Sequence, residues 1–193
     1  MKQYNSIITI LLLCLLVSCS NTNNTSEQTI DPFSNGGSER NMIVVISDIH
    51  LGADLSYAEC NTNRAVLVKL LEKVRVAPNV KELVIAGDMI DEWFVPANIN
   101  TYQGKNQNDF VKRIASTNKI IIDVLNNIIQ EKKVLVTYVP GNHDLTITAE
   151  NIESILPGIN QARDEMQGLG TYSPISMPEL AIEHGHRYNF FCA

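Results

Sequence analysis

The sequence predicts an α/β domain with a largely parallel sheet. Short apolar, β-branched segments alternate with longer segments in which apolar residues recur at helical spacing. The short segments also lead directly into polar side chains, which is a common way for an α/β sheet to present a site. Strands that alternate with helices are typical of a parallel sheet. The chain has 193 residues, enough for one domain with its own core.

The clearest predicted strand covers 134–139. It ends at a Pro-Gly turn, and the next three residues are Asn142, His143 and Asp144. Three further strands are predicted at 42–47, 82–86 and 180–183. The polar residues that follow those three strands are Asp48 and His50, then Asp88, then His184 and His186. In an open parallel sheet these strand ends lie side by side.

The predicted helices cover 63–76, 109–131 and 149–156. Pro78 and Asn79 end the first one, and Pro157 and Gly158 end the last. The segment 97–108 is polar and without period, and 168–178 is rich in Gly, Ser and Pro, so both are predicted to be loops. The apolar face of the long middle helix consists of Phe110, Ile114, Ile121, Val124, Leu125 and Ile128.

The charge and the cysteines of the chain argue against two classes of function, nucleic-acid binding and a cysteine zinc site. The formal net charge is -6 and the chain has no long basic run, so no nucleic-acid binding surface is expected. Cys60 and Cys192 lie far apart and do not show the spacing of a zinc site. Two free thiols are favoured over a disulfide between them.

The N-terminus predicts export and lipidation. Residues 7–17 form an apolar run that is short for a membrane span, and it follows a single positive residue, Lys2. The run leads into Leu-Val-Ser-Cys19, which resembles the lipobox of bacterial lipoprotein signal peptides. We therefore expect a signal peptide at 1–18, a lipid on Cys19, a polar tether over 19–40 and a domain over 41–193. The alternative is an uncleaved anchor helix. The lipoprotein interpretation implies a protein anchored to a membrane of the bacterial cell envelope, outside the cytoplasm.

The residues after the strands are of metal-ligand types. Carboxylate oxygen together with imidazole nitrogen suits Mn, Fe, Zn or a similar ion, and argues against a Ca or Mg cage. Asp48 and His50 are two residues apart, so on an extended segment both side chains lie on the same side. Asp88 has two oxygens with which to bridge two ions. Asn142 offers a carbonyl oxygen and His184 a further imidazole. Two such ions can clamp a phosphate and activate a water molecule.

The neighbouring residues suggest further roles. His143 is expected to act as general acid on the leaving oxygen, with Asp144 orienting it. Each ligand has a plainer alternative when it is considered alone: Asp88 or Asn142 as a turn residue, and His50 as a surface histidine. The combination favours a site, because each of the four predicted strands ends in ligand-type residues. Four other residues are given lesser or open roles. Trp93 is expected in packing or a lid, and Asp91 in a turn or as support for a ligand. His186 is a ligand or supports one, and Arg187 is favoured as a solvated side chain over a contact with phosphate.

In their order along the chain, these motifs resemble those of the calcineurin-like metallophosphoesterase superfamily. They are Asp48-Ile-His50, Gly87-Asp88, Gly141-Asn-His-Asp144 and His184-Gly-His186, spread over residues 42 to about 188. The resemblance implies a layered metallophosphoesterase-type fold and a phosphate mono- or diester as substrate, hydrolysed by water that two divalent ions activate. In it Asp48 and His50 bind one ion, Asp88 bridges both, and Asn142 and His184 bind the other. His143 is the catalytic histidine. Asp144 and His186 are expected to support the site, apart from what the resemblance implies.

One part of the family pattern is missing. The family's final Gly-His-x-His, which supplies a further ligand to each ion, has no counterpart after His184. The sequence is therefore expected to be the N-terminal part of a longer enzyme, with the fold incomplete at its C-terminus. The competing hypothesis is a truncated, non-catalytic, lipid-anchored remnant or interaction module. A nucleotide-binding α/β domain is disfavoured, since the chain has no Gly-rich phosphate loop.

Overall fold

A computed structural model describes residues 31–93, 95–163 and 170–190 of the chain. The predicted signal peptide at 1–18, Cys19 and Cys192 lie outside these residues. One compact unit spans Pro32–Ala193, so residues 32–40 of the predicted tether belong to the folded unit. Phe33 is buried there. The Asn79 side chain donates to the carbonyl groups of Gly37 and Glu39 at 2.8 and 2.9 Å.

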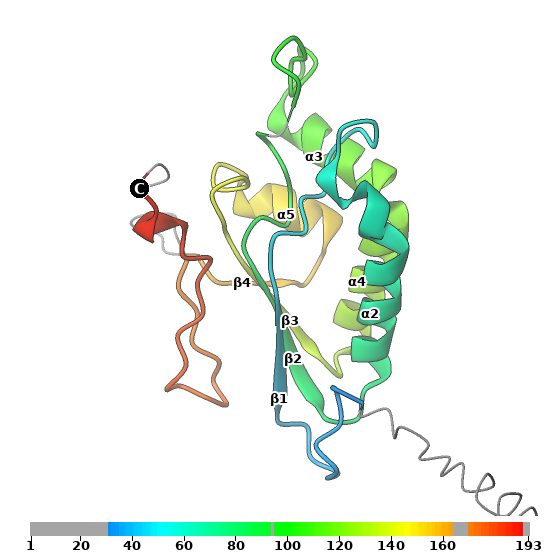
Figure 1. Ribbon diagram of the computed structural model, residues 1–193, viewed down its shortest axis with the longest axis vertical. Helices are drawn as coiled ribbons and strands as arrows, with labels where there is room; N and C mark the ends of the chain where they lie inside the picture. The colour runs from blue at the N-terminus through cyan, green and yellow to red at the C-terminus, as the bar shows by residue number, and fades with distance from the viewer. Residues whose placement is uncertain (1–30, 94, 164–169, 191–193) are drawn as a thin grey trace, which may run out of the picture. The chain divides into compact units, whose positions relative to one another are not determined.

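The sheet has four parallel strands in the order β1-β2-β3-β4 (Figure 1). They are β1 (Met42–Ile46), β2 (Val80–Ala86), β3 (Leu135–Val139) and β4 (Asn160–Gln161). The predicted α/β class with a parallel sheet is confirmed, and the first three strands coincide with the predicted segments 42–47, 82–86 and 134–139. Residues 83–86 of β2 are apolar on both faces and buried, as is typical of a parallel strand inside a sheet.

The prediction of a fourth strand at 180–183 is wrong. In this segment Ile182 forms a single antiparallel bridge with Tyr172, with N–H···O distances of 2.7 and 2.8 Å, and the segment does not join the sheet. Both side chains pack instead on a small cluster formed by Val84, Ala86 and Val139. The apolar character that predicts a strand here serves packing on a sheet face. The sheet's fourth member is the short, polar β4.

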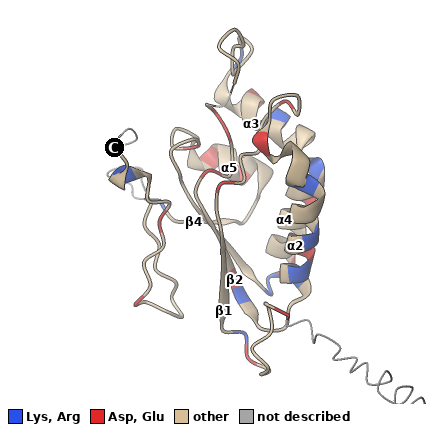
Figure 2. Cartoon of the chain, viewed as in Figure 1, with Lys and Arg blue, Asp and Glu red and all other residues tan. Residues whose placement is uncertain are grey.

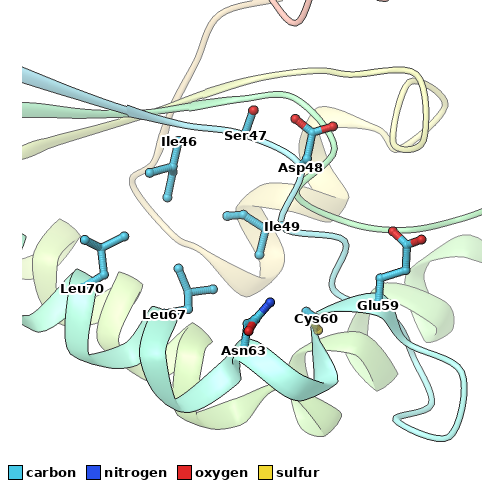
Figure 3. Close-up of a pocket in the computed structure, with 9 residues that line it drawn as sticks. All are labelled: Ile46, Ser47, Asp48, Ile49, Glu59, Cys60, Asn63, Leu67 and Leu70. Carbon is cyan, nitrogen blue, oxygen red and sulfur yellow. The ribbon is translucent and has the colours of Figure 1, made fainter.

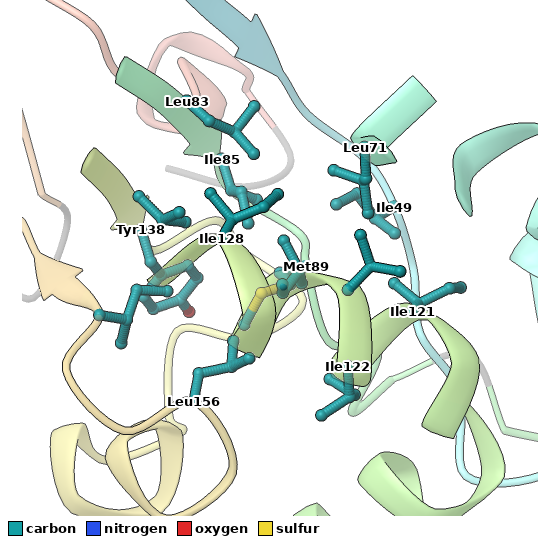
Figure 4. Close-up of a cluster of buried hydrophobic side chains, with 14 of the residues drawn as sticks. Ile49, Leu71, Leu83, Ile85, Met89, Ile121, Ile122, Ile128, Tyr138 and Leu156 are labelled. Carbon is teal, nitrogen blue, oxygen red and sulfur yellow. The ribbon is translucent and has the colours of Figure 1, made fainter. Parts of the chain in front are cut away.

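The helices are α2 (Arg64–Val76), α3 (Gln107–Thr117), α4 (Lys119–Glu131) and α5 (Ala149–Ile155), with 3-10 turns η1 (Glu59–Asn63) and η2 (His186–Tyr188). Figure 1 shows α2 and α4 along one face of the sheet, with the segment from 170 to 188 on the opposite side. Side chains of β2 and β3 alternate between the two faces. Leu83, Ile85 and Tyr138 enter the main core under the helices (Figure 4), while Val84 faces the other way.

The long helix predicted over 109–131 is broken in two at Asn118. This residue has φ −107° and ψ 28°, and its side chain is fully buried. Its Nδ2 donates to the carbonyl oxygens of Gly52 at 2.9 Å and Ile114 at 3.0 Å. Asparagine competes with the helix in this way by bonding to backbone groups. The apolar period continues through the break, so periodicity alone does not reveal it.

Among the described residues, no helix combines the length and the apolar character that a membrane crossing requires.

We expect Asn118→Ala to lower the free energy of unfolding by about 2 kcal/mol, because the buried Gly52 carbonyl would lose its donor. Urea denaturation followed by circular dichroism measures this change. Asn127→Ala is the matched control, since Asn127 is exposed on α4. Equal stability of the two variants would contradict the role given to Asn118.

Candidate metal centre

The candidate ligands lie on loops that continue side by side beyond β1 and β2. His50 N–H donates to the Asp88 carbonyl at 2.9 Å, and Leu51 N–H donates to the Met89 carbonyl at the same distance. Asp91 N–H returns a bond to Leu51 at 3.2 Å. Figure 2 shows acidic residues in the loops at these strand ends, while many of the basic residues lie on the helices. The parallel order of β1, β2 and β3 therefore brings three of the predicted motifs to one edge of the sheet.

The backbone here is not extended. Asp48, His50 and Asp88 have φ values of 55°, 50° and 51°, in the left-handed region that non-glycine residues rarely adopt. The sequence analysis expected Asp48 and His50 to lie on the same side of an extended strand. They are instead brought together by left-handed backbone conformations. Such conformations cost on the order of 1–3 kcal/mol each and cluster at functional sites, where the surroundings hold them in place.

Asp48, His50 and Asp88 form one group whose ligand atoms all lie within 4.8 Å of one another. His50 Nε2 is 3.8 Å from Asp48 Oδ1 and 3.8 Å from Asp88 Oδ2. Asp88 is buried, whereas the Asp48 side chain is 56% exposed. The group is therefore buried at Asp88 and exposed to solvent at Asp48. This arrangement suits an ion that must also contact a substrate.

Asp88 also contacts the second set of predicted ligands. Its Oδ2 lies 3.2 Å from His184 Nε2, and that nitrogen is 3.1 Å from Asn142 Oδ1. His184 Nδ1 lies 2.9 Å from the Ala86 carbonyl, so it carries the N–H that donates there. His184 Nε2 thus faces two oxygen acceptors, an arrangement that needs a proton or a cation between them. The donor set fits a divalent ion.

Two glycines allow this close approach. Gly87 has φ 89°, and a Cβ atom at this position would collide with the imidazole of His184. A Cβ on Gly141 would collide with the Asp88 carboxylate and backbone. Any larger residue would push His184 or Asp88 away.

His143 is held by Asp91. His143 Nδ1 is 3.0 Å from Asp91 Oδ1, and His50 Nδ1 is 3.3 Å from Asp91 Oδ2. These three residues form a second group whose ligand atoms converge within 4.8 Å. The Trp93 side chain is 54% exposed, and its ring centroid lies 5.2 Å from that of His143. Asp91 also accepts a bond from Trp93 N–H at 3.0 Å, so it both closes a turn and supports a ligand.

The expectation that Asp144 orients His143 is wrong. Asp144 is fully buried, and its carboxylate accepts backbone N–H bonds from Gly141 at 2.7 Å, Met89 at 2.8 Å and Ile90 at 3.2 Å. It ties the loop after β3 to the loop after β2. A carboxylate directly after a histidine suggests a catalytic pair, but here the backbone turns the two side chains apart.

Glu92 is a residue that the sequence reasoning misses. Its N–H donates to the His143 carbonyl at 3.1 Å, and its carboxylate accepts hydrogen bonds from the hydroxyl groups of Tyr102 and Thr146. Glu92 thereby connects the loop after β2, the loop 97–106 and the loop after β3. Its partners are distant in sequence, so only its position beside Asp91 hinted at a role.

The last motif contributes a ligand candidate and a buried neighbour. His184 joins Asp88 and Asn142, as described above. His186 is only 7% exposed, and its ring centroid lies 5.4 Å from that of His184. Arg187 is not simply solvated: its guanidinium pairs with Glu183 and donates to Thr171 at 3.2 Å.

The charges of the site are coupled through these contacts. Hydrogen bonding to Asp91 raises the pKa of His50, and hydrogen bonding to Asp88 raises the pKa of His184 to about 9. Burial opposes ionisation of Asp88, but bonds from His184 and from the His143 N–H outweigh it and lower the pKa of that carboxyl group. Burial raises the pKa of Asp144 and lowers that of His186.

Two hollows open beside the ligands. One, of about 400 Å³, lies between the end of β1 and α2 and is lined by Asp48 and Glu59 above an apolar floor that includes Ile49 and Leu67 (Figure 3). The thiol of Cys60, a free and buried cysteine, lies at its side. The other hollow, of about 350 Å³, lies between β1 and residues 181–184 and reaches His184. Of the ligand candidates, Asp48 is thus reached from one hollow and His184 from the other.

We expect the metal-free protein to lose thermal stability as the pH rises from about 7 to about 9. The pKa of His184 lies above its ordinary value of 6.5 in the folded state, so its pairing with Asp88 stabilises fully below about pH 6.5 and is lost as the pH passes through about 9. Thermal unfolding in a chelator at constant ionic strength measures this. His184→Asn should flatten the profile over that range. An unchanged profile in the variant would contradict the assignment.

Comparison with known proteins agrees with this geometry. No curated protein matches the chain. A family model described as calcineurin-like phosphoesterase matches residues 42–191, which is more than half of the chain and includes every ligand candidate named above. Proteins of this family typically bind divalent metals, in keeping with the Asp and His groups at the strand ends. The chain belongs to the calcineurin-like phosphoesterase family.

Proposed function

We propose that this protein hydrolyses phosphate mono- or diesters and that two divalent ions take part. Asp48, His50 and Asp88 would hold one ion, and Asp88, Asn142 and His184 the other. The observation that carries the proposal is the position of Asp88 Oδ2, which is 3.8 Å from His50 Nε2 and 3.2 Å from His184 Nε2. One buried carboxylate thus lies between two imidazoles, as a bridging ligand would. Family membership supports the phosphoester as substrate.

When bound, the ions would supply Lewis acidity toward the phosphoryl oxygens and lower the pKa of water. The chain's own contribution to proton transfer is centred on His143. Asp91 Oδ1 accepts from His143 Nδ1 at 3.0 Å, which leaves Nε2 as the atom that can give a proton to the leaving oxygen. The Trp93 ring lies against this imidazole and limits its rotation.

Asp91 links this acid to the metal ligands. Its second oxygen is 3.3 Å from His50 Nδ1, so one carboxylate orients both His50 and His143. A carboxylate partner fixes the tautomer and the direction of an imidazole ligand. Asp91 is therefore proposed as a positioning residue, the role that the sequence assigned to Asp144.

We expect Asp88→Asn to abolish Mn-dependent hydrolysis of p-nitrophenyl phosphate by the purified protein, because it removes the bridging charge. A loss of at least about 100-fold is expected, because the loss of a mere hydrogen-bond partner of a metal ligand already costs about 10–100-fold. His143→Ala is the matched variant. It should reduce turnover by about 10²–10⁴-fold while keeping the bound Mn, as expected when a general acid is removed. Metal content is measured by elemental analysis.

Three outcomes would count against this proposal. Turnover at the wild-type level in Asp88→Asn would remove the metal assignment. Loss of Mn from His143→Ala would make that histidine a ligand instead of an acid. An inactive but folded and Mn-loaded wild-type chain would favour the alternative, a non-catalytic remnant or interaction module.

We also propose that the protein is a lipoprotein of the bacterial cell envelope, anchored through Cys19. The support is the apolar run at 7–17 followed by the lipobox-like Leu-Val-Ser-Cys19. A lipid on this residue would place a phosphoesterase domain at a membrane surface outside the cytoplasm.

We expect Cys19→Ser to move the protein from the membrane fraction to the soluble fraction of a bacterial host and to abolish labelling by a fatty-acid analogue. Cys60→Ser is the control, because Cys60 is buried in the domain and lies outside the leader. Membrane retention without labelling in both the wild type and Cys19→Ser would support the anchor helix instead.

A further inference from the structure

His186 lies beside the metal centre without being part of it. Gly185 has φ 82°, a left-handed conformation in which the chain turns between His184 and the start of η2. The two imidazole rings consequently lie near each other, with centroids 5.4 Å apart and planes inclined at 40°. His184 uses its nitrogens on Ala86, Asp88 and Asn142, so it does not bind the His186 ring.

Neither ring nitrogen of His186 has a hydrogen-bond partner in the described part of the chain, although the side chain is 93% buried. An imidazole carries at least one N–H donor in each of its protonation states. Leaving such a group buried and unbonded costs about 1–3 kcal/mol, so it calls for an explanation. The other buried ionisable side chains at the site, Asp88, Asp91 and Asp144, all have partners.

Direct ligation of an ion does not explain His186. The described Asp, Glu, His and Cys groups whose ligand atoms converge within 4.8 Å are Asp48–His50–Asp88 and His50–Asp91–His143. His186 belongs to neither group. His184 also belongs to neither group, but its Nε2 lies 3.2 Å from Asp88 Oδ2 and 3.1 Å from Asn142 Oδ1. No group of the described residues is hydrogen-bonded to the His186 ring, which favours a partner other than the ion that Asp88, Asn142 and His184 would share.

The neighbouring cation, Arg187, is already engaged. The guanidinium of Arg187 pairs with Glu183 and donates to Thr171, so it is engaged on the segment itself. An anionic group bound at Asp88, Asn142 and His184 would lie beside His186, whose ring is 5.4 Å from that of His184 and whose nitrogens have no partner among the described residues. Phosphoryl oxygens are strong acceptors, and several of them remain exposed when a phosphate binds to metal ions.

We propose that His186 is a substrate-binding residue whose ring N–H donates to a non-bridging phosphoryl oxygen of the bound phosphoester. This inference rests on the proposed function, since it places a phosphoester at the metal centre. It assigns His186 to recognition of the phosphoryl group, whereas His143 acts on the leaving oxygen. The two histidines would contact the substrate from the loops after 182 and after β3, respectively.

Binding of inorganic phosphate to the Mn-loaded protein tests the proposal without requiring turnover. His186→Leu keeps an apolar side chain in the buried space but has no donor, whereas His186→Gln keeps an N–H. We expect His186→Leu to weaken phosphate binding about tenfold in isothermal calorimetry, the worth of one hydrogen bond to a charged acceptor. His186→Gln should recover part of the affinity. Tyr188→Ala, at a 74% exposed position of the same short helix, should bind phosphate like the wild type.

Two further measurements separate substrate binding from other roles. Mn content should stay at the wild-type level in both variants. The metal-free melting temperature should not fall, because no protein partner is lost. Loss of Mn would make His186 a ligand, and lower melting temperatures in both variants would make it a structural residue. Unchanged phosphate binding in His186→Leu, or a wild-type protein that does not bind phosphate, would also overturn the proposal. A wild type that binds phosphate without hydrolysing esters would overturn the proposed function alone.

Discussion

The carboxylate of Asp144 is the constraint on which the site depends. It is fully buried and accepts backbone N–H groups from two loops, at Gly141 on one side and at Met89 and Ile90 on the other. Hydrogen bonds to a charged, buried acceptor are among the stronger ones in a protein. They hold the ends of β2 and β3 together at the point where Asp88 and Asn142 must meet. Without this tie, the parallel register alone would leave two flexible loops.

This constraint explains how the three left-handed residues of the site are held in place. Asp48, His50 and Asp88 adopt conformations that a free loop would avoid. Backbone hydrogen bonds between the loops after β1 and β2 hold these residues in place. Asp144 in turn anchors the loop after β2. The folding energy of the sheet and helices thereby offsets local strain at the ligands.

The second constraint is the concentration of negative charge at the candidate metal centre. Asp48, Asp88 and Asp91 all have an oxygen within 3.8 Å of the His50 ring, while His143 pairs with Asp91 and His184 with Asp88. Protonated imidazoles can balance these carboxylates in the metal-free protein, which is why the pKa of His50 and of His184 is raised. Divalent ions would replace those protons and bring phosphate oxygens to a site that would otherwise repel an anion. The segment from 170 to 188 completes the arrangement by carrying His184 across the second face of the sheet.

Local sequence patterns are enough to predict the fold class, three of the strands and the identities of the ligand candidates. These follow from local patterns: apolar runs of strand length, helical periods and polar residues directly after a strand. Residues that directly follow parallel strands lie at the carboxyl edge of the sheet, where α/β folds place their sites. The helices at 63–76 and 149–156 are close to α2 and α5 for the same reason.

Contacts between residues far apart in the chain decided the rest. The break at Asn118 depends on a carbonyl at Gly52, and the packing of Tyr172 and Ile182 depends on side chains of β2 and β3. The sequence could not predict that Asp91, rather than Asp144, holds His143, because that choice depends on how two loops turn after separate strands. Nor could it predict that His186 would be buried with no hydrogen-bond partner among the residues that the structure describes. Local sequence specifies which groups are present, but the long-range geometry of the backbone decides which of them meet.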